Sequence, residues 1–540
     1  MQPITRRSVI QLGAGAATAA LVGGCSAGPA GGDGTNLDEP DPNTNLTGMP
    51  IVNEPITLQM MTRRSPNTAE DWNAVASMKK MEEISNIAVD WGAIPWEGGT
   101  ERRNLALASG DYPGILNRMG LGSVDLAKYG EQGTFMALNE LIESYMPNLK
   151  AILDANPDIR SGITLPDGNI YAMPTVYDPD FDALLMARKL WVRQDWLDDL
   201  GLDVPTTVEE FEAYLEAVMA DPPVEGVVPF TDGASGTRMI EILGGTFGIL
   251  NRGRTTLHLD ADDSGRARFY PTTDGYRETL EFLNRLYSKD LLPADLFTID
   301  QQKETALGRE GLVAATVSMA PSEYFGAVGA DYVALPPLKR SSTDPVPSWT
   351  SVSSPLAGTG GFVLTDTIEH PIEAARWMDH FYGEEGTRLF FMGVEGESYE
   401  KTANGGYELL PEITDNPDGK TPNEALRPYV NYFGGGYAGI VMEDYFMGTE
   451  NSEQSRAGTE VVADHRLEEV WPAFSYTVDE AAELTGLSVD IDKLVGESVA
   501  RFINGETALS SWDTHLGQFE RIGLPRYLEI QQAALDRYLG

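Results

Sequence analysis

The chain has 540 residues, of which 82 are Asp or Glu and 39 are Lys or Arg, so its formal net charge is −43. This balance argues against nucleic acid as a partner, because nucleic-acid-binding proteins draw most of their affinity from cations that neutralise phosphates. Hydrophobic residues make up 42% of the chain and charged residues 22%, as in ordinary globular proteins. We therefore expect a large folded body with an acidic surface, and one cysteine excludes an intramolecular disulfide.

The N-terminus has the pattern of an export signal. Arg6 and Arg7 precede an uncharged stretch over residues 8–24, and paired arginines are typical of the twin-arginine route. The stretch is too short and too rich in Ala and Gly for a membrane-spanning helix. VGGC, ending at Cys25, resembles a bacterial lipobox. We expect residues 1–24 to be cleaved and Cys25 to be acylated, with palmitate among its lipids, which would anchor the protein at the extracytoplasmic face of the cell membrane.

Residues 25–54 have the composition of a flexible tether. They are rich in Gly, Pro, Asp, Asn and Thr and contain few large apolar side chains that could offset the entropy of ordering. No later segment contains 18 consecutive apolar residues, so we expect no further membrane span. The tether would hold a globular body clear of the bilayer.

The body begins with a β-α-β pattern. ITLQMM from Ile56 and IAVDW from Ile87 have the composition of buried strands. Between them, apolar residues recur at a spacing that predicts a helix with one buried face: Trp72, Val75, Met78 and Met81.

Strands and helices continue to alternate along the chain. Thr207 and Glu210 form a capping box before a helix whose apolar face carries Val208, Phe211, Leu215 and Val218. Further helices are predicted around Tyr276 to Tyr287, after Pro371, and up to Gly505, and further strands start at Tyr332 and Gly361. This alternation predicts an α/β architecture with largely parallel sheets.

The common catalytic and cofactor motifs are missing from the sequence. The five histidines are dispersed, and no HExxH or GxSxG motif occurs, so we expect no metal centre, no cofactor and no serine nucleophile. DGKT at 418–421 lacks the first glycine of a phosphate loop, and GGGYAG at 434–439 is better explained as a turn. Pairs of carboxylates arise by chance among 82 acids, so an acid-catalysed hydrolase stays open.

Several longer segments resemble one family of exported proteins. LWVRQDWLDDLGLDVPTTVEEF (190–211), GNIYAMP (168–174), FMGVEGESYE (391–400) and the C-terminal helical segment are similar to extracellular solute-binding proteins of ABC importers, in the carbohydrate branch. DPPVEGVVPF, after the helix that starts at Val208, is too poor in oxygen ligands for the calcium loop of some relatives. The resemblance covers about residues 55–540.

The resemblance implies an α/β, two-lobed fold of the periplasmic-binding-protein type II class, with a hinge and an interlobe cleft. Lobe 1 would comprise residues 55–175 with 356–400, and lobe 2 residues 176–350 with 405–540. The chain would cross between lobes after Tyr171 to Pro174, near residues 349–360, and near residues 397–406.

The resemblance also implies a function without catalysis. The protein would capture a carbohydrate, expected to be an oligosaccharide, and deliver it to ABC permease subunits served by a separate ATPase. It would act as a monomer held to the membrane by its lipid. Two alternatives are a surface-anchored glycoside hydrolase or lyase, which would need two carboxylates about 5 to 9.5 Å apart, and a peptide-binding receptor.

Candidate ligand-binding residues follow from the chemistry of sugars. Pyranose faces stack on aromatic rings, hydroxyls need planar polar partners, and ligands of open α/β sheets bind beyond the carboxyl ends of strands. The residues that meet these criteria are Trp96, Glu97, Asn117, Arg118, Tyr177, Asp178, Asp232, Glu323, Tyr324, Trp349, Tyr432 and Phe433. Some of these aromatics are expected to pack within a lobe. Four further tryptophans lie within helical patterns and are expected in the core: Trp191, Trp196, Trp377 and Trp512.

Overall fold

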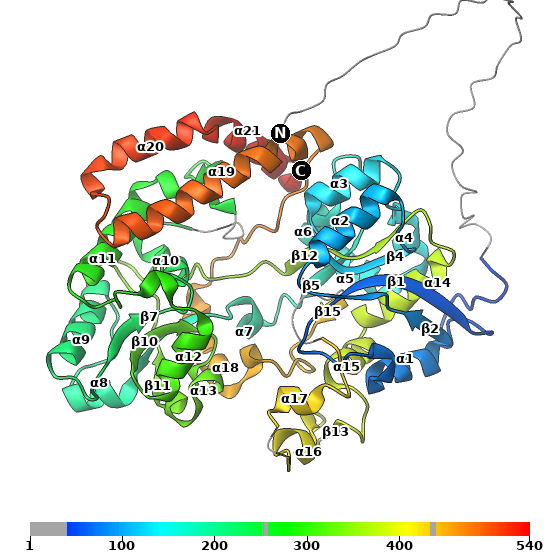
Figure 1. Cartoon of the computed structure of the whole chain (residues 1–540), viewed down its shortest axis with the longest axis horizontal. Helices are drawn as coiled ribbons and strands as arrows, with labels where there is room; N and C mark the ends of the chain where they lie inside the picture. The colour runs from blue at the N-terminus through cyan, green and yellow to red at the C-terminus, as the bar shows by residue number, and fades with distance from the viewer. Residues whose placement is uncertain (1–39, 251, 253–256, 419, 433–438) are drawn as a thin grey trace, which may run out of the picture. The chain divides into compact units, whose positions relative to one another are not determined.

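Two β-sheets, each with its own hydrophobic core, organise the body of the protein (Figure 1). The computed structural model describes residues 40–250, 252, 257–418, 420–432 and 439–540. The signal, Cys25 and most of the tether lie outside these residues. Among the described residues, no helix combines the length and apolarity that crossing a bilayer requires.

The first sheet has the strand order β15-β5-β12-β4-β1-β2, with β3 paired to β1. Its strands are β1 (Ile56–Arg64), β2 (Ile87–Asp90), β3 (Ala93–Pro95), β4 (Ile115–Leu121), β5 (Met173–Tyr177), β12 (Leu356–Leu364) and β15 (Gly439–Val441). The pairs that β1 forms with β2, β3 and β4, and the β15–β5 pair, are parallel as predicted. The yellow-green β12 runs antiparallel to both of its neighbours, β4 and β5 (Figure 1).

The second sheet has the order β11-β6-β10-β7. Its strands are β6 (Lys189–Arg193), β7 (Val228–Thr231), β10 (Val313–Ser318) and β11 (Tyr332–Ala334). Of the strand pairs that the described residues form in this sheet, only β10–β7 is parallel, so the expectation of largely parallel sheets is wrong for this sheet. Two small hairpins complete the strands: β8 (Leu259–Ala261) with β9 (Ala267–Phe269), and β13 (Tyr399–Lys401) with β14 (Tyr407–Leu409).

The helices around the first sheet bury the face that the sequence predicts. Trp72, Val75, Met78 and Met81 are all buried, with Trp72 in a 3-10 turn (Trp72–Ala74) that precedes α1. Pro371 occupies the first turn of α14 as expected. These helices are α1 (Ala76–Ser85), α2 (Gly99–Ser109), α3 (Ser123–Glu131), α4 (Asn139–Tyr145), α5 (Pro147–Ala155), α6 (Pro157–Ile163), α14 (Pro371–Asp379), α15 (Glu384–Met392), α16 (Pro411–Thr414) and α17 (Pro422–Leu426).

The capping box of the second lobe forms as predicted. The Glu210 backbone N–H donates to Thr207 Oγ1 (3.1 Å), and the Thr207 N–H donates to the Glu210 carboxylate (3.1 Å). Trp191 is buried as expected, but it lies on strand β6 and not in a helix. The helices here are α7 (Asp182–Leu185), α8 (Gln194–Leu200), α9 (Val208–Ala220), α10 (Thr237–Leu243), α11 (Asp274–Ser288), α12 (Gln301–Arg309), α13 (Pro321–Tyr324), α18 (Glu453–Val462), α19 (Val478–Ile503), α20 (Trp512–Arg521) and α21 (Leu524–Leu539).

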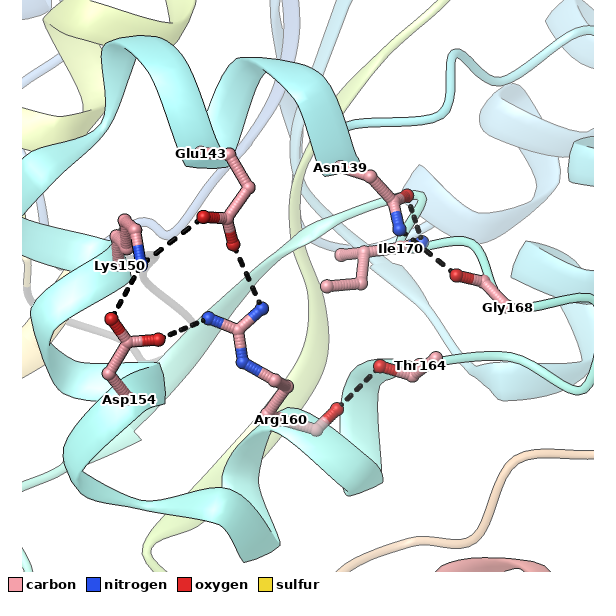
Figure 2. A network of polar contacts seen from close by, with 8 residues as sticks. All are labelled: Asn139, Glu143, Lys150, Asp154, Arg160, Thr164, Gly168 and Ile170. Carbon is pink, nitrogen blue, oxygen red and sulfur yellow. Dashed lines mark hydrogen bonds and ion pairs between the residues drawn. The ribbon is translucent and has the colours of Figure 1, made fainter.

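A network of polar contacts joins the short helices α4, α5 and α6 (Figure 2). Lys150 and Arg160 each form ion pairs with both Glu143 and Asp154, and the N···O distances are 2.6 to 3.3 Å. Hydrogen bonding to Lys150 lowers the pKa of Asp154. These four side chains are solvent-accessible, so we assign the network an orienting role and a small stabilising one.

Several chain segments cross between the two sheets and hydrogen-bond to one another. The Ser353 N–H donates to the Leu185 carbonyl (2.7 Å), and the Tyr177 N–H donates to the Pro355 carbonyl (2.8 Å). The Trp349 N–H donates to the His465 carbonyl (2.7 Å). The first crossing therefore follows β5 and the second precedes β12.

The third crossing is not where we expected it. Residues 397–406 lie in and before the β13–β14 hairpin, with its turn at residues 402–406. The chain then forms β15, which pairs with β5 of the first sheet, and it reaches α18 only after residues 442–452. Residues 439–441 thus belong to the first sheet, whereas we had assigned residues 405–540 to lobe 2. The other lobe boundaries stay predictions.

Candidate functional site

Arg63 lies over the ring of Trp96 at the carboxyl ends of β1 and β3. We call this pair of side chains the platform. The Arg63 guanidinium carbon lies 3.9 Å from the centroid of the half-buried Trp96 ring. Arg63 Nη1 also donates to Thr100 Oγ1 (3.2 Å). The predicted residue Glu97 follows directly and is exposed. A flat ring supported by a cation is a suitable surface for stacking a sugar.

Asn117 and Arg118 lie on β4 but are buried, with 7% and 5% of their surfaces exposed. Asn117 Nδ2 donates to Thr62 Oγ1 (3.3 Å), and Arg118 donates to the Asn431 carbonyl (3.3 Å). They line a cavity of about 20 Å³ together with Trp72, Trp91 and Trp377. This volume holds about one water molecule and is too small for a sugar ring, so Asn117 and Arg118 have the surroundings of interior residues of the first lobe.

Tyr177 and Asp178 lie at the start of the first crossing. The Asp178 N–H donates to the Val441 carbonyl (3.0 Å), and its carboxylate accepts from the Asp180 N–H (3.1 Å). Both side chains are half-buried. Their position joins β5 to β15 and to the crossing, which gives them a hinge location.

Asp232, directly after β7, is fully buried and orders the loop that enters α10. Its Oδ1 accepts hydrogen bonds from the backbone N–H groups of Ala234 (2.9 Å) and Gly236 (3.0 Å). Its Oδ2 accepts one from the backbone N–H of Arg238 (3.0 Å). With both oxygens engaged, Asp232 positions the loop and leaves little capacity for a ligand. Of the neighbouring candidates on α13, Glu323 is exposed and Tyr324 is half-buried.

Trp349 and Tyr432 pack inside the protein. Trp349 is 2% exposed and belongs to the second-lobe core. Tyr432 is 7% exposed and packs against Phe391, with ring centroids 5.0 Å apart. Both therefore have a packing environment in place of the predicted ligand-facing one. Phe433 lies outside the described residues.

A cavity of about 650 Å³ lies in the second lobe, between α10 and α19. Ser235 and Thr237, at the entry to α10, line it close to the carboxyl end of β7. Its apolar lining includes Tyr270, Tyr276 and Phe297, and α19 contributes Val495 and Val499. Sites for small organic ligands typically combine such a volume with aromatic walls and few polar groups.

The polar groups of this cavity are linked to the crossing segments. Glu241, on α10, accepts a hydrogen bond from Ser351 Oγ (2.6 Å), and its backbone carbonyl accepts one from Thr350 Oγ1 (2.9 Å). Asp492, on α19, lies 3.5 Å from His258 Nε2, and His258 Nδ1 lies 3.3 Å from the Tyr270 hydroxyl. α19 contacts α11 of the second lobe and α3 of the first, so the cavity adjoins an element shared by both lobes.

We did not predict the residues of this cavity. The strand-end criterion predicts Asp232 at the carboxyl end of β7, and the cavity lining begins three residues later at Ser235. The strand-end criterion could have reached Ser235 and Thr237 if the loop had been followed into the helix. Nothing in the sequence indicates that Asp492 and Val495 return to the same place from about 250 residues further along the chain.

A buried acid, Glu304 on α12, lies beneath the loop that carries Ser235. Thr316 Oγ1 donates to its Oε1 (2.7 Å), and Gln301 Nε2 donates to its Oε2 (3.2 Å). Burial, with a smaller contribution from Asp232, raises the pKa of Glu304 to about 7. The folded protein therefore holds a proton at Glu304 between about pH 4.5 and 7 that the unfolded chain releases.

The Glu304→Gln variant is expected to remove a pH dependence of stability. Because the pKa is raised in the folded state, the contribution of Glu304 falls as the pH rises from 4.5 to 7. The free energy of unfolding of Glu304→Gln relative to the wild type should therefore increase over this range, by up to about 3 kcal/mol. Urea denaturation at several pH values measures this difference. The exposed Glu310→Gln should show no such trend, and parallel pH profiles for Glu304→Gln and wild type would contradict the assignment.

Known proteins of the same architecture resemble this chain. Residues 65–388 match the family model of bacterial extracellular solute-binding proteins. The fructooligosaccharide ABC transporter substrate-binding protein FusA of Streptococcus pneumoniae is 25% identical over 518 residues, covering 92% of this chain and 93% of FusA. The polygalacturonan/rhamnogalacturonan-binding protein YtcQ of Bacillus subtilis is 25% identical over 239 residues, covering 44% of this chain and 45% of YtcQ.

Solved structures agree with the fold. FusA in complex with kestose superposes with a TM-score of 0.74 at 23% identity, covering 90% of this chain and 99% of FusA. An extracellular solute-binding protein from Bifidobacterium longum subsp. infantis gives a TM-score of 0.75 at 21% identity, covering 90% and 98% of the two chains. Because the family model matches more than half of the sequence, this chain belongs to the bacterial extracellular solute-binding protein family and has its two-lobed α/β fold.

Proposed function

We propose that this protein captures an oligosaccharide outside the cell and delivers it unchanged to the permease of an ABC importer. The cavity between α10 and α19 carries this proposal, since it combines aromatic walls with hydroxyl and carboxylate groups at the end of a strand. The similarity to FusA along nearly the whole chain supports a saccharide over a peptide.

The mode of attachment and the site residues are part of the same proposal. Cys25, after a signal over residues 1–24, would carry the lipid that holds a monomeric receptor at the membrane. Trp96 in the first lobe and the α10–α19 cavity in the second would contact the sugar. Residues 178–188, 335–355 and 442–452 would form the hinge. A ligand closes such a hinge only if it binds the closed form more tightly than the open form.

A ligand screen tests this function. The full chain is mixed with neutral and acidic mono- and oligosaccharides and with peptides, and its melting temperature is recorded. We expect stabilisation by oligosaccharides with micromolar affinity, equivalent to about −8 kcal/mol, and about 2.7 kcal/mol of stabilisation at 100 times Kd. Chromatography should recover the sugar uncut. Stabilisation by peptides alone, or appearance of new reducing ends, would contradict the proposal, the latter favouring a glycoside hydrolase or lyase.

Replacing Trp96 tests the first-lobe contact. Because its ring is half-buried and supported by Arg63, Trp96→Ala should weaken oligosaccharide binding about tenfold, or about 1.4 kcal/mol, with a small loss of stability. Titration calorimetry measures the change in Kd. Trp512→Phe is the matched control, since Trp512 is buried against Phe502 and should affect stability only. An unchanged Kd for Trp96→Ala would show that the platform does not meet the ligand.

A further inference from the structure

Two carboxylates stand out in the described lining of the α10–α19 cavity. Its ionisable lining consists of the carboxylates Glu241 and Asp492, the imidazole of His258 and two tyrosines. Within the described part of the chain, no lysine or arginine lines it. Among the described lining residues, a ligand carboxylate placed here would meet the two carboxylates and the His258 imidazole, and no guanidinium or ammonium group.

Two described arginines near the cavity, Arg268 and Arg238, have partners within the second lobe. Arg268 forms an ion pair with the fully buried Asp260 (2.6 Å), and Arg238 donates to the Asp232 carbonyl (2.8 Å) and to Gln301 (2.9 Å). Redirecting Arg268 toward a ligand would leave the Asp260 carboxylate buried without its cation, which is strongly unfavourable. Arg268 and Arg238 are therefore held by groups of the second lobe.

The two carboxylates can accept hydrogen bonds from the hydroxyl groups of a sugar. Asp492 is about half exposed, and Glu241 receives one hydrogen bond from Ser351, so each retains lone pairs that can accept a hydrogen bond from a sugar. The formal net charge of −43 adds a long-range repulsion against polyanions. In a uronate homopolymer every ring carries a carboxylate, so no register of such a chain avoids placing one in the cavity.

We propose that the α10–α19 cavity selects uncharged sugar rings and excludes uronates. This inference rests on the proposed function, and it decides between the ligand types of two similar proteins, since FusA is named for fructooligosaccharides and YtcQ for polygalacturonan. Asp492 and Glu241 are its specificity-determining residues.

The test uses a matched pair of ligands and a matched pair of variants. The neutral oligosaccharide that stabilises the full chain most is compared with its analogue in which primary alcohols are oxidised to carboxylates. Wild-type protein should bind the neutral form at least about tenfold more tightly, and the gap should narrow as salt screens the repulsion. Asp492→Asn should reduce the ratio of the dissociation constants of the oxidised and neutral ligands severalfold. Asp490→Asn makes the same charge change on the same helix, at an exposed residue outside the lining, and should leave the gap unchanged.

Each outcome decides a different statement. Equal or tighter binding of the oxidised ligand overturns the charge selectivity and leaves oligosaccharide capture intact. Equal effects of Asp492→Asn and Asp490→Asn overturn the assignment of selectivity to this cavity. Failure of every neutral and oxidised saccharide to bind overturns the proposed function itself, and the selectivity with it.

Discussion

The backbone hydrogen bonds among the crossing segments are the constraint on which the rest of the structure depends. The second crossing is bonded to the first through Ser353 and Tyr177, and to the segment after α18 through Trp349. An ion pair between Asp182 and Arg466 joins the first crossing to that same segment. These bonds fix which residues of the crossing segments meet at the hinge between the lobes.

The cavity of the second lobe is coupled to this hinge by direct bonds. Glu241 lines the cavity and holds Ser351 of the second crossing, and the Thr350 hydroxyl donates to the backbone of the same residue. α19, which forms the opposite wall, also contacts α3 of the first lobe. In the function proposed above, a ligand in the cavity would touch elements whose positions change when the lobes rotate, which is the differential contact that closure requires.

Local patterns predicted local structure well. The Thr207 capping box, the buried face from Trp72 to Met81 and the end of the long C-terminal helix near Gly505 depend on neighbours in sequence, and all are present. The candidate site was harder. Trp349 and Tyr432 look like loop aromatics in the sequence, yet long-range packing buries them. Asp492 joins the cavity only because α19 folds back over α10, which no local periodicity encodes.

The claim that two lobes close on an oligosaccharide is tested most directly by an interlobe distance. Spin labels at Lys79→Cys on α1 and Glu209→Cys on α9, two exposed positions, report it by double electron–electron resonance in a chain with Cys25→Ser. We expect the distance distribution to move to shorter values when a neutral oligosaccharide is added. A distribution that stays the same at saturating ligand would contradict it.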